Sequence, residues 1–397
     1  MKECPEIFNW IDSQEDVMLN LLTEWAGINT HTSNFSGLHN FSEKITSVFS
    51  IFNESIEYVD LPSYEAINNN GEVEKCSVAP AIALCKRPEA KKQILFVCHM
   101  DTVFPKEGAF QDVVRERDLL KGPGVADAKG GIVVMLKVLE AFEQWEGKES
   151  VGWKVVLNAD EEIGSPSSAD FIMETAKKFN FGFVFEPCLP DGNLVGTRKG
   201  SGNFTLVVRG KSAHAGRHHV DGRNAIEAAA ECISKVAGLN HQREGLTVNI
   251  GVIDGGTAFN VVPELAIVRF NVRIKQGKDK VFVEENINKI IQEVAQTHEV
   301  NIQLHGRFFA TPKILDEKGL KLFNHVKVCG QELGMDIRWF ESGGVCDGNR
   351  LAAVGLPTVD TLGVRGGGLH SDQEYMEVES LIERVKLGVL SLIKEGL

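Results

Sequence analysis

Short apolar runs rich in Val, Ile and Phe recur through the first half of the chain and near its end, separated by stretches with helical periodicity. The expected strands are Ser55–Leu61, Ala81–Lys86, Gln93–His99, Trp153–Ala159, Gly182–Glu186 and Leu356–Leu362. Expected helices are Gly130–Glu143, Ser167–Lys178 and a first helix that starts at Ser13, with Asp16 completing a capping-box variant, and ends at Gly27. This alternation predicts an α/β fold with a mostly parallel sheet covered by helices on both faces.

The middle of the chain has a different element order. Its expected elements are a strand Asn203–Val208, a helix Gly222–Val236, strands Leu246–Ile253 and Ala266–Ile274, a helix Asp279–Thr297 and a strand Asn301–Gly306. That βαββαβ order is typical of a ferredoxin-like sandwich. We expect it to be a lid and dimerisation domain inserted at 199–311 into a catalytic domain made of 1–198 and 312–397. Hinges are expected near Gly196–Gly202 and Ala310–Pro312.

Composition narrows the classes of partner. The 397 residues carry a net charge of -13, which argues against nucleic acid or an anionic membrane as a partner. No apolar run approaches the roughly 20 residues that span a bilayer, and the N-terminus lacks a secretory apolar region. The eight cysteines are scattered without a CxxC pair, as reduced thiols would be. We therefore expect a soluble cytoplasmic protein.

Two candidate site residues lie at or near the ends of apolar segments that precede polar loops. His99 ends an expected strand in the run FVCHMD, where Asp101 is placed to accept a ring N–H. Asp127 lies among glycines in GVADAKGG, just before an apolar helix. The loop lacks the spacing of either phosphate-binding glycine motif, so a metal-bridging carboxylate fits better. Taken singly, a hydrogen-bonded core histidine is the favoured explanation of His99, and an ordinary helix-start loop is that of Asp127.

Three consecutive acids, Asp160, Glu161 and Glu162, follow another expected strand in NADEEIGS. Such acids repel one another unless a cation lies among them, and neighbouring acids can then divide the roles of ligand and base. The ordinary alternative is a solvated acidic turn at a helix start. Glu186 follows a further strand, and His370 lies in GGGLHSD; taken singly, each is best explained as a solvated residue. Together they complete a set of nitrogen and oxygen donors that suits zinc or another borderline divalent ion.

Together and in this order, these residues resemble the M20 metallopeptidases, and within them the glutamate carboxypeptidase (carboxypeptidase G2-like) branch. The resemblance extends from about Ile94 to Met376. It implies two Zn2+ per subunit, with Co2+ or Mn2+ as substitutes. The implied ligands are a bridging Asp127, with His99 and Glu186 on one ion and Glu162 and His370 on the other.

The resemblance also implies roles beyond the ligands. Glu161 corresponds to the general base, and Asp101 to the acid that supports the first histidine. His214, in SAHAG, corresponds to a lid histidine that enters the partner subunit's site and stabilises the oxyanion. Asn260 and Arg273 resemble substrate-binding positions, although a turn Asn and a solvated strand Arg are the ordinary alternatives. A glutamate at position 186 is typical of the carboxypeptidase and deacylase members.

The expected function is a two-zinc hydrolase that cleaves a C-terminal peptide or amide bond next to a free carboxylate in a small peptide or N-acyl amino acid. The expected assembly is a homodimer through the lid. One alternative is an N-acyl amino-acid deacylase of the acetylornithine or succinyl-diaminopimelate type. A more remote alternative is a non-catalytic binding relative, which would be expected to lack the base or a ligand.

Overall fold

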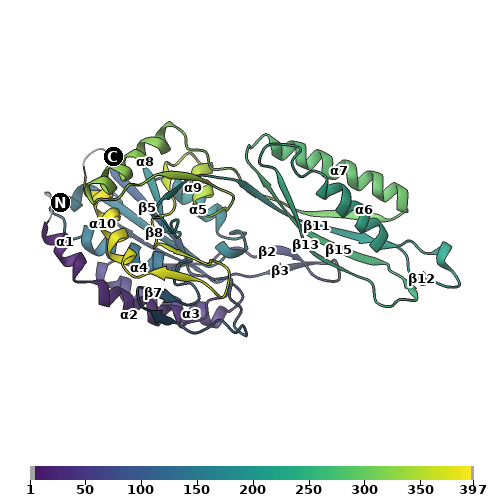
Figure 1. Cartoon of the computed structure of the whole chain (residues 1–397), viewed down its shortest axis with the longest axis horizontal. Coiled ribbons are helices and arrows are strands. Elements are labelled where there is room, and N and C mark those ends of the chain that lie inside the picture. Colours follow the sequence, from purple (N-terminus) through teal and green to yellow (C-terminus); the bar gives the residue numbers. More distant parts are fainter. Residues whose placement is uncertain (1–4, 395–397) are drawn as a thin grey trace.

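The computed structural model describes residues 5–394, so Cys4 and the final residues of the expected catalytic domain lie outside the described part. Two units follow one another along the long axis of the molecule (Figure 1). We call residues 200–310 the small unit and the rest of the described chain the large unit. None of the described helices is long and apolar enough to cross a membrane.

The large unit is built around a six-stranded sheet in the order β1-β4-β8-β5-β9-β18. Its strands are β1 (Ile56–Val59), β4 (Ala81–Lys86), β5 (Lys92–His99), β8 (Val151–Asn158), β9 (Phe181–Val184) and β18 (Thr358–Val359). Only β4 is antiparallel to its two neighbours, so the predicted mostly parallel sheet is confirmed. The last strand is much shorter than its predicted span.

Helices cover both faces of this sheet. One face packs against α1 (Pro5–Asp12), α2 (Glu15–Ala26), α3 (Phe35–Phe49), α4 (Lys129–Phe142), α8 (Glu317–Glu332) and α10 (Ser380–Ile393). The other face packs against α5 (Ala169–Ala176) and α9 (Gly348–Ala353). The predicted cap of α2 is wrong: Gln14 is the N-cap residue, and the Ser13 hydroxyl donates to the carbonyl of Trp10. A separate helix, α1, ends just before Ser13 and takes that hydroxyl.

The small unit has the predicted βαββαβ order. Its main elements are β11 (Gly200–Arg209), α6 (Ala225–Ala237), β13 (Thr247–Gly255), β15 (Leu265–Ile274), α7 (Asp279–His298) and β16 (Asn301–Ala310). The four strands form an antiparallel sheet in the order β13-β15-β11-β16. Its core lies against α6 and α7, which leaves the opposite sheet face without a helix.

Shorter strands complete the fold. They are β2 (Tyr64–Ile67), β3 (Val73–Cys76), β6 (Val114–Glu116), β7 (Leu119–Lys121), β10 (Leu194–Arg198), β12 (Ala213–His214), β14 (Val261–Val262), β17 (Trp339–Ser342), β19 (Gly366–Gly367) and β20 (Tyr375–Glu377). The β2–β3 hairpin reaches from the large unit to the small one (Figure 1). At its tip, the carbonyls of Asn70 and Gly71 accept hydrogen bonds from Arg209, and Ile67 accepts one from Arg269.

The two chain segments that join the units are paired with each other. Arg198 and Lys313 exchange main-chain hydrogen bonds of 3.1 and 3.0 Å. Their side chains converge on Asp360, which follows β18: Arg198 Nε lies 2.7 Å and Lys313 Nζ 2.9 Å from the same carboxylate oxygen. All three residues are buried. Both connections are therefore anchored on one carboxylate of the large unit.

Candidate metal centre

The candidate ligands gather at the carboxyl edge of the large sheet, where parallel strands place their following loops together. His99 is the last residue of β5, Glu186 follows β9 by two residues, and Asp127 precedes α4. Glu162 lies in a 3-10 turn, Glu161–Ile163, directly after β8, and His370 follows β19. His99, Asp127 and Glu186 are buried, whereas the His370 side chain is 56% exposed.

Asp127 lies between the two histidines. Its Oδ1 is 3.1 Å from Nε2 of His99, and its Oδ2 is 3.3 Å from Nε2 of His370. Each histidine has a second carboxylate beside the same nitrogen: Glu186 is 3.7 Å from His99, and Glu162 is 3.3 Å from His370. One shared acid and two His–Glu pairs thus form two adjoining donor sets.

His99 contacts the main-chain carbonyl of Asp101 more closely than the Asp101 carboxylate, which was the expected partner of its ring N–H. The Nδ1 atom of His99 lies 2.9 Å from the main-chain carbonyl oxygen of Asp101 and 3.5 Å from its carboxylate. That carboxylate accepts hydrogen bonds from the main-chain N–H groups of Glu161 and Glu162, both at 3.2 Å, and from the hydroxyl of Thr32. Asp101 therefore links the first histidine to the loop that carries the acids.

A second set of buried contacts holds the same loop. The carboxylate of Asp160 accepts from the main-chain N–H groups of Ser167 and Ser168, at 2.9 and 3.0 Å. Asp347 accepts the hydroxyl of Ser165 at 2.6 Å. Arg350 donates to the carbonyl of Gly164 at 2.6 Å. Of the three consecutive acids, Asp160 thus has a structural role.

Glu374 is a further site residue that the sequence pattern did not reveal. Its Oε1 accepts the main-chain N–H groups of Ala126 and Asp127 at 3.0 and 3.1 Å, while its Oε2 is buried without a hydrogen-bond partner. Burial and the charge of Asp127 raise the pKa of Glu374 to about 8. Glu374 thus fixes the main chain on which the shared carboxylate is mounted.

The charge balance of the cluster tests whether a cation fits there. Burial, with Asp127 nearby, raises the pKa of Glu186 to about 8 despite the opposing effect of His99, and raises that of Glu162 to about 7. Burial and Glu186 also raise the pKa of Glu161 well above its usual value. The Oε1 atom of Glu162 is buried without a partner. Carboxylates packed this closely lack positive charge, and divalent ions at a nitrogen and oxygen donor set would supply it.

The three small-unit residues singled out in the sequence fall into two groups. Arg273, near the end of β15, lies close enough to the cluster for Glu161 to act on its charge, and its Nη1 donates to the carbonyl of Gly343 at 3.5 Å. His214 and Asn260 lie together at the opposite end of the small unit, where β12 pairs with β14 and Ala215 donates to Asn260 (Figure 1). About 27 Å of strand, at about 3.4 Å per residue, separates Leu265 from Arg273. Within one chain, Asn260 and Arg273 therefore do not converge.

A cavity of about 540 Å³ adjoins the cluster. It is lined by Val103, Phe104, Pro105, Gly108, Ala109, Phe110, Gln111, His370, Ser371 and Asp372. The rings of Phe104 and Phe110 lie 5.1 Å apart in its wall. An apolar group next to His370 would find complementary surface there.

Parts of the chain match known peptidase families and their members. A profile described as a peptidase dimerisation domain of the M20 type matches residues 196–299, and one for peptidase family M28 matches residues 81–221. Carboxypeptidase G2 from Pseudomonas sp. strain RS-16 is 28% identical over 322 residues, or 77% of this chain and 74% of that protein. A succinyl-diaminopimelate desuccinylase from Nitrosospira multiformis is 26% identical over 71% of this chain and 76% of its own length.

A solved structure resembles the whole fold. The M20 family metallo-carboxypeptidase from Sulfolobus solfataricus superposes with a TM-score of 0.74 at 17% identity. The alignment covers 94% of this chain and 98% of that one. Because the identity is low, this likeness supports the fold rather than a shared substrate.

Proposed function

We propose that the chain is a zinc-dependent hydrolase of the M20 peptidase family that cleaves a peptide or amide bond next to a free carboxylate. One observation carries the proposal: the two oxygens of Asp127 address two histidines, each of which has its own glutamate. A shared acid between two separate donor sets suits a pair of ions better than one.

In this proposal His99 and Glu186 would hold one zinc ion, Glu162 and His370 the other, and Asp127 both. When bound, such a pair lowers the pKa of water and polarises a carbonyl group. The protein's own contribution to proton transfer is Glu161, whose carboxylate would take the proton of the attacking water and return it to the leaving amine. Asp101 holds the main chain of Glu161, so the base is oriented before substrate arrives.

Arg273 is the proposed partner of the substrate carboxylate. Among the described residues it forms no ion pair; its Nε donates to the side-chain oxygen of Asn271 at 2.9 Å. Burial lowers the pKa of Arg273, with Glu161 acting in the opposite direction. A half-buried guanidinium without an acid gains most from a carboxylate brought by a ligand, and its planar geometry allows two parallel hydrogen bonds.

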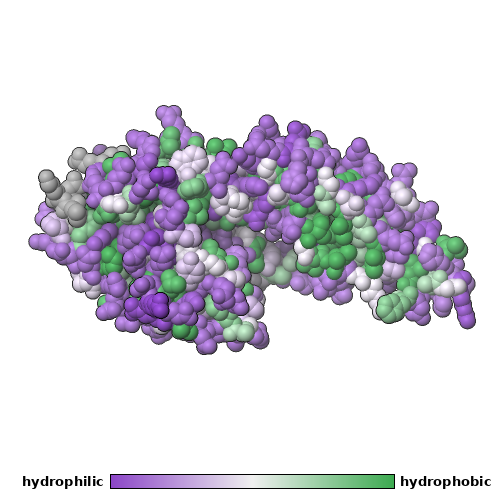
Figure 2. All heavy atoms as spheres, viewed as in Figure 1, coloured by the Kyte–Doolittle hydropathy of each residue, from purple (hydrophilic) through white to green (hydrophobic). Residues whose placement is uncertain are grey.

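We further propose that residues 199–311 form a lid and dimerisation domain. The edge strand β13 carries Val252 and Ile253, which are exposed by 47% and 52%. Apolar residues also gather on the visible surface of the small unit (Figure 2). An exposed apolar edge strand is a ready site for pairing with a second copy of the chain. His214 and Asn260, remote from their own cluster, would then be available to the partner's.

An N-acyl amino-acid deacylase is the second candidate, because a succinyl-diaminopimelate desuccinylase aligns with 71% of this chain at 26% identity. Both reactions cleave an amide near a carboxylate and need the same ligands. In the deciding experiment, the purified enzyme is loaded with zinc, and kcat/KM is compared for acyl-glutamates, dipeptides, N-acetyl-ornithine and N-succinyl-diaminopimelate. We expect chelator-sensitive hydrolysis with a preference for acyl-glutamates or dipeptides. Preference for the last two substrates would favour the deacylase, and chelator-resistant turnover would reject the metal-dependent mechanism.

A further inference from the structure

A cavity of about 360 Å³ opens at the amino-terminal edge of the same parallel strands that carry the metal-centre residues at their other end. We call it the lysine cavity; its lining is Lys91, Lys92, Asn180, Phe181, Lys318, Lys321, Leu322 and Pro357. Lys92 begins β5 and His99 ends it, so roughly 23 Å of strand separates the cavity from the metal centre. The cavity is therefore distinct from the proposed active site.

The charge of the lysine cavity is opposite to that of the chain. Four of its eight lining residues are lysines and none is an acid, although the protein has a net charge of -13. Within residues 5–394, none of these four lysines forms an ion pair. Positive charge left unpaired around a concave surface attracts and retains anions.

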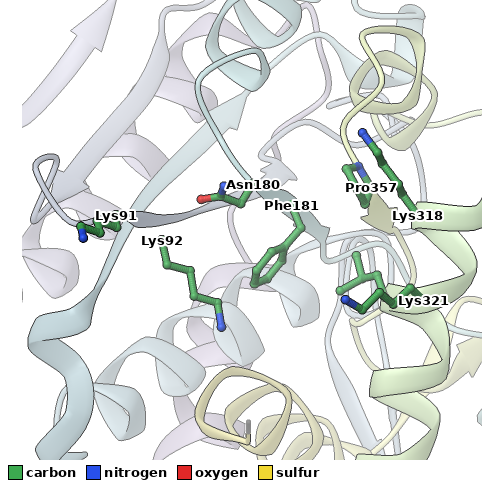
Figure 3. A pocket seen from close by; sticks show the side chains of 8 residues that line it. Lys91, Lys92, Asn180, Phe181, Lys318, Lys321 and Pro357 are labelled. Atoms are coloured by element: carbon green, nitrogen blue, oxygen red, sulfur yellow. The ribbon is translucent and has the colours of Figure 1, made fainter. Parts of the chain in front are cut away.

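Lys92 shows this most clearly. It is half-buried, its ammonium group lies 5.7 Å from the centre of the Phe181 ring, and burial lowers its pKa. Figure 3 shows Lys92 and Lys321 extending toward the Phe181 ring from two sides. A partly desolvated ammonium that forms no ion pair with the described residues is stabilised when a ligand supplies negative charge.

The side chains also indicate which anion fits. The cationic lining is four lysines, whose combined charge suits a multiply charged anion, and lysine is a common phosphate ligand as a point charge. Phe181, Leu322 and Pro357 add an apolar wall to the same cavity. The volume lies at the lower end of the range for small-molecule sites, roughly 300–1,000 Å³.

We propose that the lysine cavity binds a small organic phosphate, with the phosphate groups among the lysines and the organic part against the apolar wall. This inference is independent of the proposed hydrolase activity, because it uses none of the metal-centre residues. A nucleoside diphosphate has the required charge and an uncharged ring system, so ADP is a suitable probe.

The test is isothermal titration calorimetry of the zinc-loaded enzyme at fixed ionic strength with ADP, pyrophosphate and adenosine. We expect ADP to bind, and to bind at least about tenfold more tightly than either of the other two, because each lacks one half of the ligand. The double variant Lys318→Glu/Lys321→Glu reverses two exposed charges and should weaken ADP by at least about tenfold. Lys327→Glu is the matched control on the same helix, outside the cavity, and should leave affinity unchanged.

Several results would overturn the proposal. The first is an absence of ADP binding to the unaltered enzyme, and the second is equal binding to the double variant and the control. Pyrophosphate or adenosine binding as tightly as ADP would remove the argument for an organic phosphate. ADP can also bind zinc ions, so binding that survives in the double variant but disappears after chelation would place ADP at the metal centre instead. Far-UV circular dichroism of each variant checks that the fold is intact.

Discussion

The Asp360→Asn substitution should destabilise the protein strongly, because Asp360 is the only acid that pairs with either Arg198 or Lys313 in the described structure. Asp360 is fully buried, and the two cations are exposed by only 8% and 4%. Its carboxylate accepts from Arg198 Nε at 2.7 Å, Arg198 Nη2 at 3.3 Å and Lys313 Nζ at 2.9 Å. An asparagine keeps the shape but removes the ion-pair partner of both buried cations.

Breaking a buried ion pair by removing one partner costs about 3–5 kcal/mol. That cost corresponds to a change in the folding equilibrium of roughly 10²-fold to more than 10³-fold, at about 1.4 kcal/mol per factor of ten. Lys313→Met should cost less, because Asp360 would stay paired with Arg198. In the Lys313→Met/Asp360→Asn double variant the two costs should not add, since one buried cation has been removed with the acid.

Urea unfolding at neutral pH, followed by circular dichroism at constant zinc concentration, measures these differences. Asp336→Asn is the control: its ion pair with Arg338 joins side chains that are 66% and 68% exposed, and such pairs contribute only about 0–1 kcal/mol. If Asp360→Asn lowers the free energy of unfolding no more than this control does, the buried cluster does not anchor the connections as argued.

The pH dependence provides an independent check. Burial alone would raise the pKa of Asp360, but Arg198 and Lys313 hold it below its usual value. A carboxyl group with a lowered folded-state pKa stabilises the protein above its unfolded-state pKa, about 3.9 for Asp. The stability difference between the unaltered protein and Asp360→Asn should therefore be constant near neutrality and shrink only as the pH falls below about 4.

Three further predictions concern the metal centre. Glu161→Gln should abolish turnover while zinc content by mass spectrometry stays at two per chain; Glu162→Gln should instead lower zinc content, and exchanged phenotypes would reverse the two roles. Arg273→Ala should lower kcat/KM for free-acid substrates by a factor that corresponds to about 2–5 kcal/mol of lost transition-state binding, and should affect amidated substrates much less. Equal losses for both kinds of substrate would contradict the proposed contact between Arg273 and the substrate carboxylate. Glu374→Gln keeps an acceptor oxygen for the N–H groups of Ala126 and Asp127 and should retain zinc, whereas Glu374→Leu should lose it; equal zinc content in both would rule out a positioning role.

The central strands β5, β8 and β9 could be predicted because they are largely apolar runs, which buried parallel strands require. The expected helices did not include α1, α3, α8, α9 and α10, and only some of these lack a local signal. α1 is only eight residues long, and α3 contains Gly37 and several Ser, Thr and Asn residues that have low helix propensity. Its buried residues Leu38, Phe41, Ile45 and Phe49 do follow helical spacing, so a periodicity count over that window could have found it.

Four of the five candidate ligands could be identified from the sequence because His99, Glu162 and Glu186 end or follow apolar strands and Asp127 precedes an apolar helix. His370 lies in a glycine-rich loop, and only the family resemblance singled it out. Glu374 and Asp347 could not be identified from the sequence. Glu374 acts on main-chain groups 248 and 247 positions away, and Asp347 on Ser165, 182 positions away. Their importance depends on tertiary contacts that no local spacing encodes. The role of the Asp101 carboxylate was likewise hidden, because its partners are main-chain N–H groups rather than a recognisable side chain.

The separation of the lid residues leads to a prediction about how two subunits would share their sites. Arg273 lies beside the metal centre of its own chain, while His214 lies at the far end of the small unit. If His214 serves the partner's site, each active site needs Glu161 from one chain and His214 from the other.

Glu161→Gln and His214→Ala should then each be nearly inactive as homodimers, but mixing the two should restore activity. Half of the randomly exchanged dimers are mixed, and each of these contains one complete site, so about one quarter of the unaltered activity is expected after subunit exchange. Two chains that both carry Glu161→Gln and His214→Ala provide the control and should show no recovery. If His214 acted within its own chain, no mixed dimer would contain a complete site and activity would stay absent.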